Sequence, residues 1–468
     1  MGGIRGGTFS ENVFRNRCRR GVSGVERGPS RRRGAETPLP CSVPSLVRSS
    51  EAAMPPSANE HRNEPACPFR MDPAGGDLQA EAAELRQVGP AVRAVLPGGV
   101  VAWSVTRYES IKELVSDPRV SRDFRAHWPD RDRVPDGWTL GALTFMEGFL
   151  NRYGEEHRRL RRMVSPAFTP KRVRALEETV RDRARVLIAE MARSAPGDVV
   201  DLRSSFSWPL TMWVICELLG VPDERREALG AAVDALLDTS AAPERALETR
   251  GHIYRLLAEL AEYKREHPAP DLTGDLTAYE GRGELSSEEL VGTLLLMIGA
   301  GFETAVNLIT SSVHSLLTHP EQRERLVRGE LSAEEVVEES LRRDPPVMHL
   351  PMRYAVEDID LGEGALIRRG EAILVGFGGG GRDPELHPEA PDLFDPDRTS
   401  KEHLSFGFGA HFCVGAHLAR LEGRVALEEL FATLPDLEPA APGAEPPRIP
   451  SIIVNGAAEL PVIPHPAT

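Results

Sequence analysis

Residues 290–320 constrain the fold most strongly, because this long stretch carries a single charged side chain, Glu303. As one helix it would be about 45–50 Å long, which is enough to cross a bilayer. Threonine, asparagine, serine and histidine recur along it, however, and they make it too polar for lipid. Ser286, followed by two glutamates, predicts the start of the helix, and His319-Pro320 predicts its end. We therefore expect a helix through the core of a large protein, with Glu303 either paired or functional.

The composition is that of a globular protein with a substantial core. The chain has 468 residues, of which 41% are hydrophobic and 27% are charged, with a net charge of −15. Five cysteines are too few, and odd in number, for a disulfide framework. The acidic total argues against nucleic acid as the main partner. Residues 173–192 have the periodicity of an amphipathic helix. Short runs with β-strand character lie at residues 100–105, 352–359, 372–377 and 451–454. We expect a fold that is mainly α with small β-sheets, in a single domain over residues 66–468.

Residues 1–65 differ from the rest. The first fifty hold ten arginines, no lysine and three glutamates among many glycines, serines and prolines, without helical or strand periodicity. This composition predicts a disordered extension. The pair Arg19-Arg20 is not followed by an apolar segment, so we do not interpret it as an export signal. Met54 and Met71 raise the hypothesis that translation starts later than residue 1.

Residues 406–415 read Phe-Gly-Phe-Gly-Ala-His-Phe-Cys-Val-Gly and lead into a helical pattern, so Cys413 lies just before a helix N-terminus. The three glycines let the backbone approach a flat group closely. Three interpretations follow from the residues alone. Cys413 is a small buried core residue, or a zinc ligand together with His403, His411 and His417, although their spacing matches no usual zinc pattern. The third interpretation is a single thiolate ligand to haem iron.

The pattern Phe-Gly-x-Gly-x-His-x-Cys-x-Gly closely resembles the haem-binding loop of the cytochrome P450 family, and the resemblance extends over residues 66–468. It implies the single-domain P450 fold, with a long central helix over haem b and Cys413 as the iron ligand. It also assigns four neighbours of the cysteine to cofactor binding, namely Phe406, Gly407, His411 and Gly415. Several other stretches are similar to the actinobacterial members that tailor polyketides and macrolides: residues 347–358, 401–404 and 451–456.

Glu339 and Arg342 are three residues apart and share one face of a predicted helix. Alone, such a pair is usually a solvated surface pair. The resemblance implies instead that Glu339, Arg342 and Arg398 form a structural ion cluster that steadies the cysteine loop.

His157 and Arg161 are four residues apart in an arginine-rich run, which alone is typical of an exposed basic helix face. The resemblance assigns both to the haem propionates, together with Arg353 and His411, through charge-assisted hydrogen bonds. The other arginines of the run would then form an outer basic patch for an acidic electron donor. These are Arg158, Arg159 and Arg162.

Residues 299–304 read Gly-Ala-Gly-Phe-Glu-Thr in the middle of the long helix. The small residues alone indicate close packing or a local kink. The resemblance implies that Ala300 and Gly301 open a groove for dioxygen over the haem. It also implies that Thr304 donates a proton to the bound oxygen and that Glu303 relays protons from water. Ala305 stands where many relatives carry a second threonine.

Residues 376–381 contain a literal Gly-x-Gly-x-x-Gly after a strand-like run. A dinucleotide fingerprint also needs a helix that opens at the third glycine, whereas here a segment interrupted by prolines follows. We therefore expect no dinucleotide site there, and electrons must come from separate proteins.

The resemblance implies a haem-thiolate monooxygenase that receives electrons from NAD(P)H through ferredoxin reductase and ferredoxin. It would insert one atom of dioxygen into a hydrophobic small molecule, by hydroxylation or epoxidation of a secondary metabolite. We expect a cytoplasmic monomer that has neither a membrane nor a nucleic-acid partner. Two alternatives stay open, a peroxide-dependent haem-thiolate enzyme and a non-catalytic P450-like binding or recruitment module. The expected substrate walls are residues 128–150, 229–254, 296–304, 347–350 and 453–454.

Overall fold

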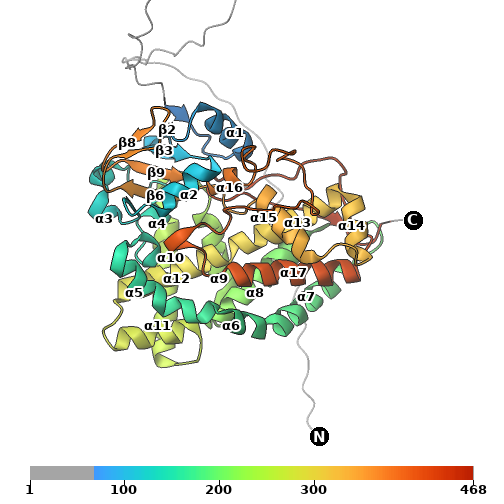
Figure 1. Ribbon diagram of the computed structural model, residues 1–468. Helices are drawn as coiled ribbons and strands as arrows, with labels where there is room; N and C mark the ends of the chain where they lie inside the picture. The colour runs from blue at the N-terminus through green and yellow to red at the C-terminus, as the bar shows by residue number, and fades with distance from the viewer. Residues whose placement is uncertain (1–67, 467–468) are drawn as a thin grey trace, which may run out of the picture. The chain divides into compact units, whose positions relative to one another are not determined.

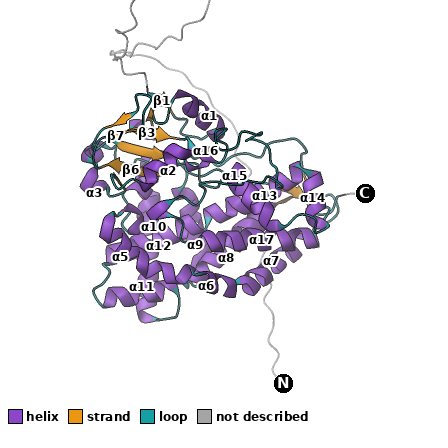
Figure 2. Cartoon of the chain, viewed as in Figure 1, coloured by secondary structure: helices purple, strands orange, loops and turns teal. Residues whose placement is uncertain are grey.

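The computed structural model describes residues 68–466 (Figure 1). The extension predicted for residues 1–65 and the hypothesis of a later start therefore lie outside the described residues. In the described part, helices dominate (Figure 2), and the strands form one six-stranded sheet and two smaller ones. The prediction of a mainly α fold with small sheets is confirmed.

Figure 1 labels the helices by their order along the chain. The first group comprises α1 (Leu78–Val88), α2 (Tyr108–Ser116), α3 (Phe124–His127), α4 (Gly141–Thr144), α5 (Gly154–Val164), α6 (Pro170–Ala175), α7 (Glu177–Met191), α8 (Trp208–Leu219) and α9 (Asp223–Leu236). The second group comprises α10 (Pro243–Glu266), α11 (Leu272–Gly281), α12 (Ser287–Gly301), α13 (Glu303–Thr318), α14 (Pro320–Val327), α15 (Ala333–Arg343), α16 (Phe377–Gly380) and α17 (Ala416–Thr433).

A six-stranded sheet with the order β1-β2-β3-β9-β6-β4 forms the main β region. Its strands are β1 (Phe69–Arg70), β2 (Val92–Val95), β3 (Val101–Val105), β4 (Val120–Ser121), β6 (Leu350–Ala355) and β9 (Ala372–Val375). There are two smaller sheets. One has the order β10-β11-β5, with β5 (Val200–Asp201), β10 (Glu438–Pro439) and β11 (Pro461–Ile463). The other pairs β7 (Ile359–Asp360) with β8 (Leu366–Ile367).

One predicted helix and one predicted strand differ in the structure. The helix expected at residues 173–192 is divided into α6 and α7, with Leu176 between them. Residues 451–454 form only an isolated bridge, from Val454 to Val347, instead of a strand.

The predicted long helix is present as two consecutive parts, α12 and α13, which are separated at Phe302. Its start is a capping box, in which Ser286 Oγ accepts from the Glu289 N–H (3.1 Å) and Glu289 Oε2 accepts from the Ser286 N–H (2.9 Å). Its most apolar window is long and hydrophobic enough to span a membrane, but 78% of that window is buried inside the protein. The apolar residues therefore serve the core, as the sequence predicts.

The interruption lies at the small residues that predict a kink. The Phe302 N–H still donates to the Ile298 carbonyl (3.1 Å), and the regular ladder resumes where the Val306 N–H donates to the Phe302 carbonyl (3.1 Å). Between these bonds, Thr304 Oγ1 donates to the Ala300 carbonyl at 2.6 Å. A side-chain hydroxyl thus satisfies a backbone acceptor at the break.

The glycine-rich run after β9 is a packing device. Residues 377–380 form the short helix α16, which ends where a dinucleotide-binding helix would have to begin. A Cβ atom on Gly378 would lie 2.5 Å from Met348 Sδ, and one on Gly381 would overlap the Arg342 carbonyl. Side chains are therefore excluded because the run packs against the end of α15 and the start of β6.

Two glycines of α12 give a matched test of a second place where the backbone packs too closely for a side chain. In Gly292→Ala the new methyl group would overlap the Glu147 carbonyl oxygen, so we expect a loss of about 2–3 kcal/mol in the free energy of unfolding. In the control Gly299→Ala nothing lies within 4 Å of the new Cβ. The control should be neutral or more stable by up to about 1 kcal/mol. Urea unfolding of both variants measures this, and equal stabilities would contradict the packing at Gly292.

Candidate active site

A large cavity lies between the break in the long helix and the cysteine loop. It encloses about 1280 Å³ of space free of protein atoms, a volume that includes its open mouth. Its walls are mostly apolar and come from distant parts of the chain. They include Phe149, Leu150, Leu296, Met297, Ala300, Gly301, Thr304, Val347, Leu350, Phe377, Phe406, Gly407, Cys413, Val414 and Gly415.

The cysteine loop is a tight turn closed by backbone hydrogen bonds. The Gly407 N–H donates to the Leu404 carbonyl (2.8 Å), and the Cys413 N–H donates to the Phe406 carbonyl (2.8 Å). Gly407 has a φ of 69°, which favours glycine. The thiol opens onto the cavity just before α17 begins, so the loop aims one sulfur atom into the open space.

The surroundings of Cys413 act on its ionisation in opposite directions. Burial raises the pKa of the Cys413 thiol, while the Gly415 N–H and the guanidinium groups of Arg161 and Arg420 oppose the rise. A cation in the cavity would be needed to favour the thiolate. Among residues 68–466, no three histidine, cysteine or acidic side chains gather closely enough to hold a metal, so the zinc interpretation is wrong.

Basic side chains gather at one end of the same cavity. His157 on α5 and Arg353 on β6 are only 3% and 2% exposed. The rings of His157 and His411 lie 4.1 Å apart between centroids, and Arg161, Arg353 and His411 line the cavity. Arg161 also donates from Nη2 to the Phe412 carbonyl (2.5 Å), which ties α5 to the cysteine loop.

This basic end lacks balancing negative charge. Burial lowers the pKa of His157 to about 4 and also lowers the pKa of His411 and Arg353, with the neighbouring cations adding to the effect. Within the described chain, His157 Nε2, His411 Nδ1 and Arg353 Nε are buried without hydrogen-bond partners. A flat group with two carboxylates and a metal cation would satisfy these donors and the thiol together, and haem is such a group.

Glu339, Arg342 and Arg398 meet in the core behind the loop. Both oxygens of Glu339 accept from Arg342 at 2.7 Å, and neither side chain is exposed. Arg398 Nε lies 3.8 Å from Glu339 Oε1, which also accepts from the Asp395 N–H (2.8 Å). The structure thus brings the three predicted residues together in a buried cluster instead of on the surface.

Thr304 and Glu303 lie on different sides of α13. Thr304 lines the cavity, whereas Glu303 does not and is only 2% exposed. Both Glu303 oxygens accept from Arg203 Nη2, at 2.8 and 2.9 Å. Arg203 belongs to the π-helical turn η5 (Arg203–Ser207) and also donates to Asn307 Oδ1 (3.1 Å). Burial raises the pKa of Glu303 to about 7; Arg203 opposes the rise and Asp234 adds to it. The long helix therefore faces the cavity with a hydroxyl and the core with an ion pair.

The sequence analysis missed Glu422, an acid on α17 that lines the cavity. It is 2% exposed, and its Oε2 has no hydrogen-bond partner among the described residues. Burial raises the pKa of Glu422 well above its ordinary value. The only sequence signal is an acid at a position where the helical period expects an apolar residue. Burial thus favours the protonated form of a carboxyl group that faces the cavity.

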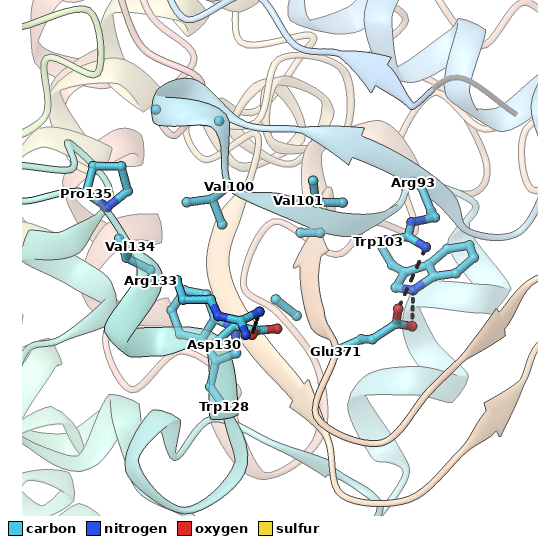
Figure 3. A pocket seen from close by; sticks show the side chains of 14 residues that line it. Arg93, Val100, Val101, Trp103, Trp128, Asp130, Arg133, Val134, Pro135 and Glu371 are labelled. Atoms are coloured by element: carbon cyan, nitrogen blue, oxygen red, sulfur yellow. Dashed lines mark hydrogen bonds and ion pairs between the residues drawn. The ribbon is translucent and has the colours of Figure 1, made fainter. Parts of the chain in front are cut away.

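Two of the expected substrate walls lie elsewhere. None of residues 229–254 or 453–454 lines the cavity, and the first part of the segment 128–150 lines a separate pocket. That pocket lies over β2 and β3 (Figure 3), with Trp103, Trp128, Val134 and Pro135 among its walls. Its polar groups pair with one another, as Trp103 Nε1 donates to Glu371 Oε2 at 2.6 Å. It is not part of the site that contains Cys413.

The comparisons with known proteins agree with this geometry. The family model for Cytochrome P450 matches residues 332–435, which include the buried cluster and the cysteine loop. The 2-hydroxy-5-methyl-1-naphthoate 7-hydroxylase of Streptomyces carzinostaticus is 40% identical over 399 residues, which cover 85% of this chain and 97% of that protein. The chain belongs to the cytochrome P450 family.

Further relatives of this P450 support the same assignment. The mycinamicin IV hydroxylase/epoxidase of Micromonospora griseorubida is 35% identical over 401 residues, covering 85% of this chain and 98% of that protein. The solved structure of CYP154A1 from Streptomyces coelicolor A3(2) has a TM-score of 0.82 and 44% identity, and covers 85% of this chain and 100% of that chain. The protein is a cytochrome P450 monooxygenase, and the family implies haem as its cofactor.

The outer basic patch expected on α5 is weaker than the sequence suggests. Arg158 pairs with Glu155, and Arg159 pairs with both Glu156 (2.9 Å) and Glu289 (2.5 Å). Glutamates one turn earlier on α5, together with Glu289 of α12, thus neutralise much of its charge.

The raised pKa of Glu422 gives a testable pH dependence. An acid with a higher pKa in the folded than in the unfolded state makes the free energy of unfolding depend on pH. Above the pKa that the acid has in the unfolded state, the free energy of unfolding falls by up to about 1.4 kcal/mol per pH unit. Glu422→Gln keeps the shape of the protonated acid. We expect it to match the wild type at pH 5 and to be increasingly more stable than the wild type towards pH 8. Denaturant unfolding of both holoenzymes measures the difference, and a constant difference across this range would contradict a protonated Glu422.

Proposed function

We propose that this P450 inserts one oxygen atom from dioxygen into a hydrophobic secondary metabolite, by hydroxylation or epoxidation, with electrons from a ferredoxin system. The observation that carries the proposal is that Cys413 and Thr304 open onto one mostly apolar cavity that Arg161, Arg353 and His411 also line. The names of two relatives, a naphthoate hydroxylase and a mycinamicin hydroxylase/epoxidase, support the substrate class and the reaction type.

Haem b, when bound, supplies the reductive activation of dioxygen. Cys413 would bind its iron, and the basic end of the cavity would hold its carboxylates. That set comprises His157, Arg161, Arg353 and His411. Phe406, Gly407 and Gly415 would form the wall on the cysteine side, and Ala300 and Gly301 leave room for dioxygen on the opposite side.

Proton delivery would begin at the Thr304 hydroxyl, which lines the cavity and lies at the break of the helix. Glu303 is the next residue but points to the core, where Arg203 holds it. Its pKa near 7 lets it take up and release protons at neutral pH. In this proposal Glu303 is a proton store that recharges Thr304 through water when its bond to Arg203 opens.

The proposed ferredoxin would dock beside the cysteine loop. Phe408 and Phe412 expose 38% and 42% of their area there, and Lys112 Nζ lies 5.5 Å from the centre of the Phe408 ring. Apolar side chains beside a cation suit a small acidic protein. Use of NAD(P)H through ferredoxin reductase, a cytoplasmic location and a monomeric state stay predictions.

The spectrum of the reduced protein with carbon monoxide tests the proposed function. The wild type should give the band of a thiolate-bound haem, and Cys413→His should abolish that band because imidazole replaces the thiolate. Cys216→Ala is the matched control, since Cys216 is a buried cysteine on α8 away from the cavity, and it should keep the band. Colourless wild-type protein, after expression with ample iron and porphyrin precursor, would contradict the proposal.

Thr304→Ala tests the proton-delivery role. We expect the variant to consume NAD(P)H and release hydrogen peroxide, with product per NAD(P)H reduced roughly tenfold or more. Thr318→Ala, an exposed threonine at the end of the same helix, should couple like the wild type. Ferredoxin-driven turnover of any ligand that the wild type oxidises measures the ratio. Unchanged coupling in Thr304→Ala would refute the role, and equal turnover with hydrogen peroxide alone would favour the peroxide-dependent alternative.

A further inference from the structure

Arg420 on α17 lies over the aromatic ring of Phe406, the residue that begins the cysteine loop. Its Cζ atom is 4.5 Å from the centre of the ring, the shortest cation–ring distance in the described part of the chain. Phe406 lines the cavity, and its carbonyl oxygen accepts from the Cys413 N–H (2.8 Å). A permanent positive charge is therefore stacked on the residue that fixes the backbone of Cys413.

Glu338 on α15 holds the guanidinium of Arg420 in this place. Its Oε1 accepts from Arg420 Nε (2.6 Å), and its Oε2 accepts from Arg420 Nη2 (3.0 Å). This two-point contact fixes the plane of the guanidinium. The two side chains are 37% and 31% exposed, and the helices that carry them pack against each other. The position of the charge is thus set by two packed helices instead of by a free surface side chain.

His403 contacts the same carboxylate without adding a charge. Its Nδ1 accepts from the Ser405 N–H (3.1 Å), so Nε2 carries the ring hydrogen and faces Glu338 Oε2 at 3.4 Å. Burial raises the pKa of Glu338, whereas the hydrogen bonds from His403 and Arg420 lower it, to about 2 overall. Glu338 is therefore ionised at neutral pH. The cluster consists of one carboxylate, one guanidinium and, in this tautomer, one neutral imidazole.

The two charges of the pair act unequally on Cys413. Burial raises the pKa of the Cys413 thiol, and the charge of Arg420 is one of the influences that oppose the rise, so this charge acts on the sulfur. Among the described residues, no carboxylate adds to the rise. The positive member of the pair therefore dominates at the cysteine, and Glu338 acts mainly on Arg420.

A charge beside a redox centre changes its reduction potential. A centre that takes up one electron becomes more negative by one charge, so a nearby cation stabilises the reduced form more than the oxidised form. A carboxylate that partly neutralises this cation has the opposite effect. The axial ligand and its surroundings are the means by which a protein sets the potential of a haem.

We propose that Glu338 and Arg420 are positioning residues that set the reduction potential of the haem from the cysteine side. Arg420 favours the ferrous form, and Glu338 holds Arg420 over Phe406 and offsets part of its charge. The inference rests on the proposed function, in which one electron from the ferredoxin converts ferric into ferrous haem; no bond or proton changes at either residue. Neither residue lines the cavity. Their removal should therefore change the potential and leave the thiolate ligand in place.

The test measures the ferric–ferrous midpoint potential of the substrate-free holoenzymes by spectroelectrochemical titration at fixed ionic strength. In Arg420→Met the cation is lost and Glu338 stays negative. We expect the equilibrium to shift roughly tenfold towards the ferric form, which lowers the potential by about 59 mV. Glu338→Gln keeps the shape of the acid and should raise the potential above that of the wild type. The double variant should lie between the two single variants.

Arg424→Met is the matched control. Arg424 lies one turn further along α17, is also partly buried, and pairs with Glu177 (2.8 Å) and Glu334 (3.2 Å). Its loss removes comparable ion pairs from the same helix, and we expect the wild-type potential. Arg420→Lys keeps the charge but not the planar fork, and it should recover most of the shift seen in Arg420→Met. All variants should keep the band of the thiolate-bound haem with carbon monoxide.

Equal potentials in the wild type, Arg420→Met and Glu338→Gln would overturn this inference. Shifts of the same sign in both single variants, or an equal shift in Arg424→Met, would also overturn it and would assign the pair a purely structural role. An Arg420→Lys variant with the potential of Arg420→Met would refute the role of the charge. A wild type that binds no haem, or lacks the thiolate band, contradicts the proposed function itself, so the two failures are distinguishable.

Discussion

Charge balance inside one cavity is the constraint on which the rest of the structure depends. Buried arginines and histidines of the cavity lack an acidic partner from the described chain. In the same cavity, burial works against ionisation of the Cys413 thiol. The basic side chains require negative charge, and the thiolate requires positive charge. Haem carries both, with carboxylates on its edge and iron at its centre, so a single cofactor resolves two electrostatic problems of opposite sign. Any molecule that binds only the native state stabilises it, and here the gain comes from charges that the polypeptide leaves unbalanced.

The buried ion cluster near the cavity holds the long irregular segment before Cys413 in place. Glu339 and Arg342 form a fully buried ion pair, and such pairs repay their desolvation only when further hydrogen bonds satisfy them. Glu339 also accepts from the Asp395 N–H and lies near Arg398. The loop that precedes Cys413 is therefore anchored in the core by charge-assisted bonds, although it contains little regular secondary structure.

Local patterns in the sequence predict much of this arrangement. The capping box at Ser286 and the two glycines before Glu303 predict the start and the break of the long helix, because both depend on near neighbours along the chain. The cysteine loop is equally local, since its turn needs glycine at Gly407 and its thiol precedes a helix.

The sequence does not reveal the orientation of side chains whose contacts come from residues far away along the chain. Glu303 was expected to face the oxygen site, but its partner Arg203 lies 100 residues earlier on a π-helical turn that no local pattern marks. Glu422 faces the cavity because α17 packs along α13 and α15, and the orientation of one helix against another is set by tertiary contacts. The same holds for the expected wall at residues 453–454, which does not line the cavity; the Ile453 carbonyl accepts from the Met348 N–H (2.7 Å).

The guanidinium of Arg342 has one more consequence. Its five N–H groups are all committed, two to Glu339 and three to the carbonyl oxygens of Gly381, Pro391 and Leu393. Because the three carbonyls converge on one side chain, the chain length between residues 381 and 393 is fixed in the way that a turn fixes the register of a hairpin. A change of chain length that displaces one of these carbonyls would leave a buried N–H group of Arg342 without its acceptor.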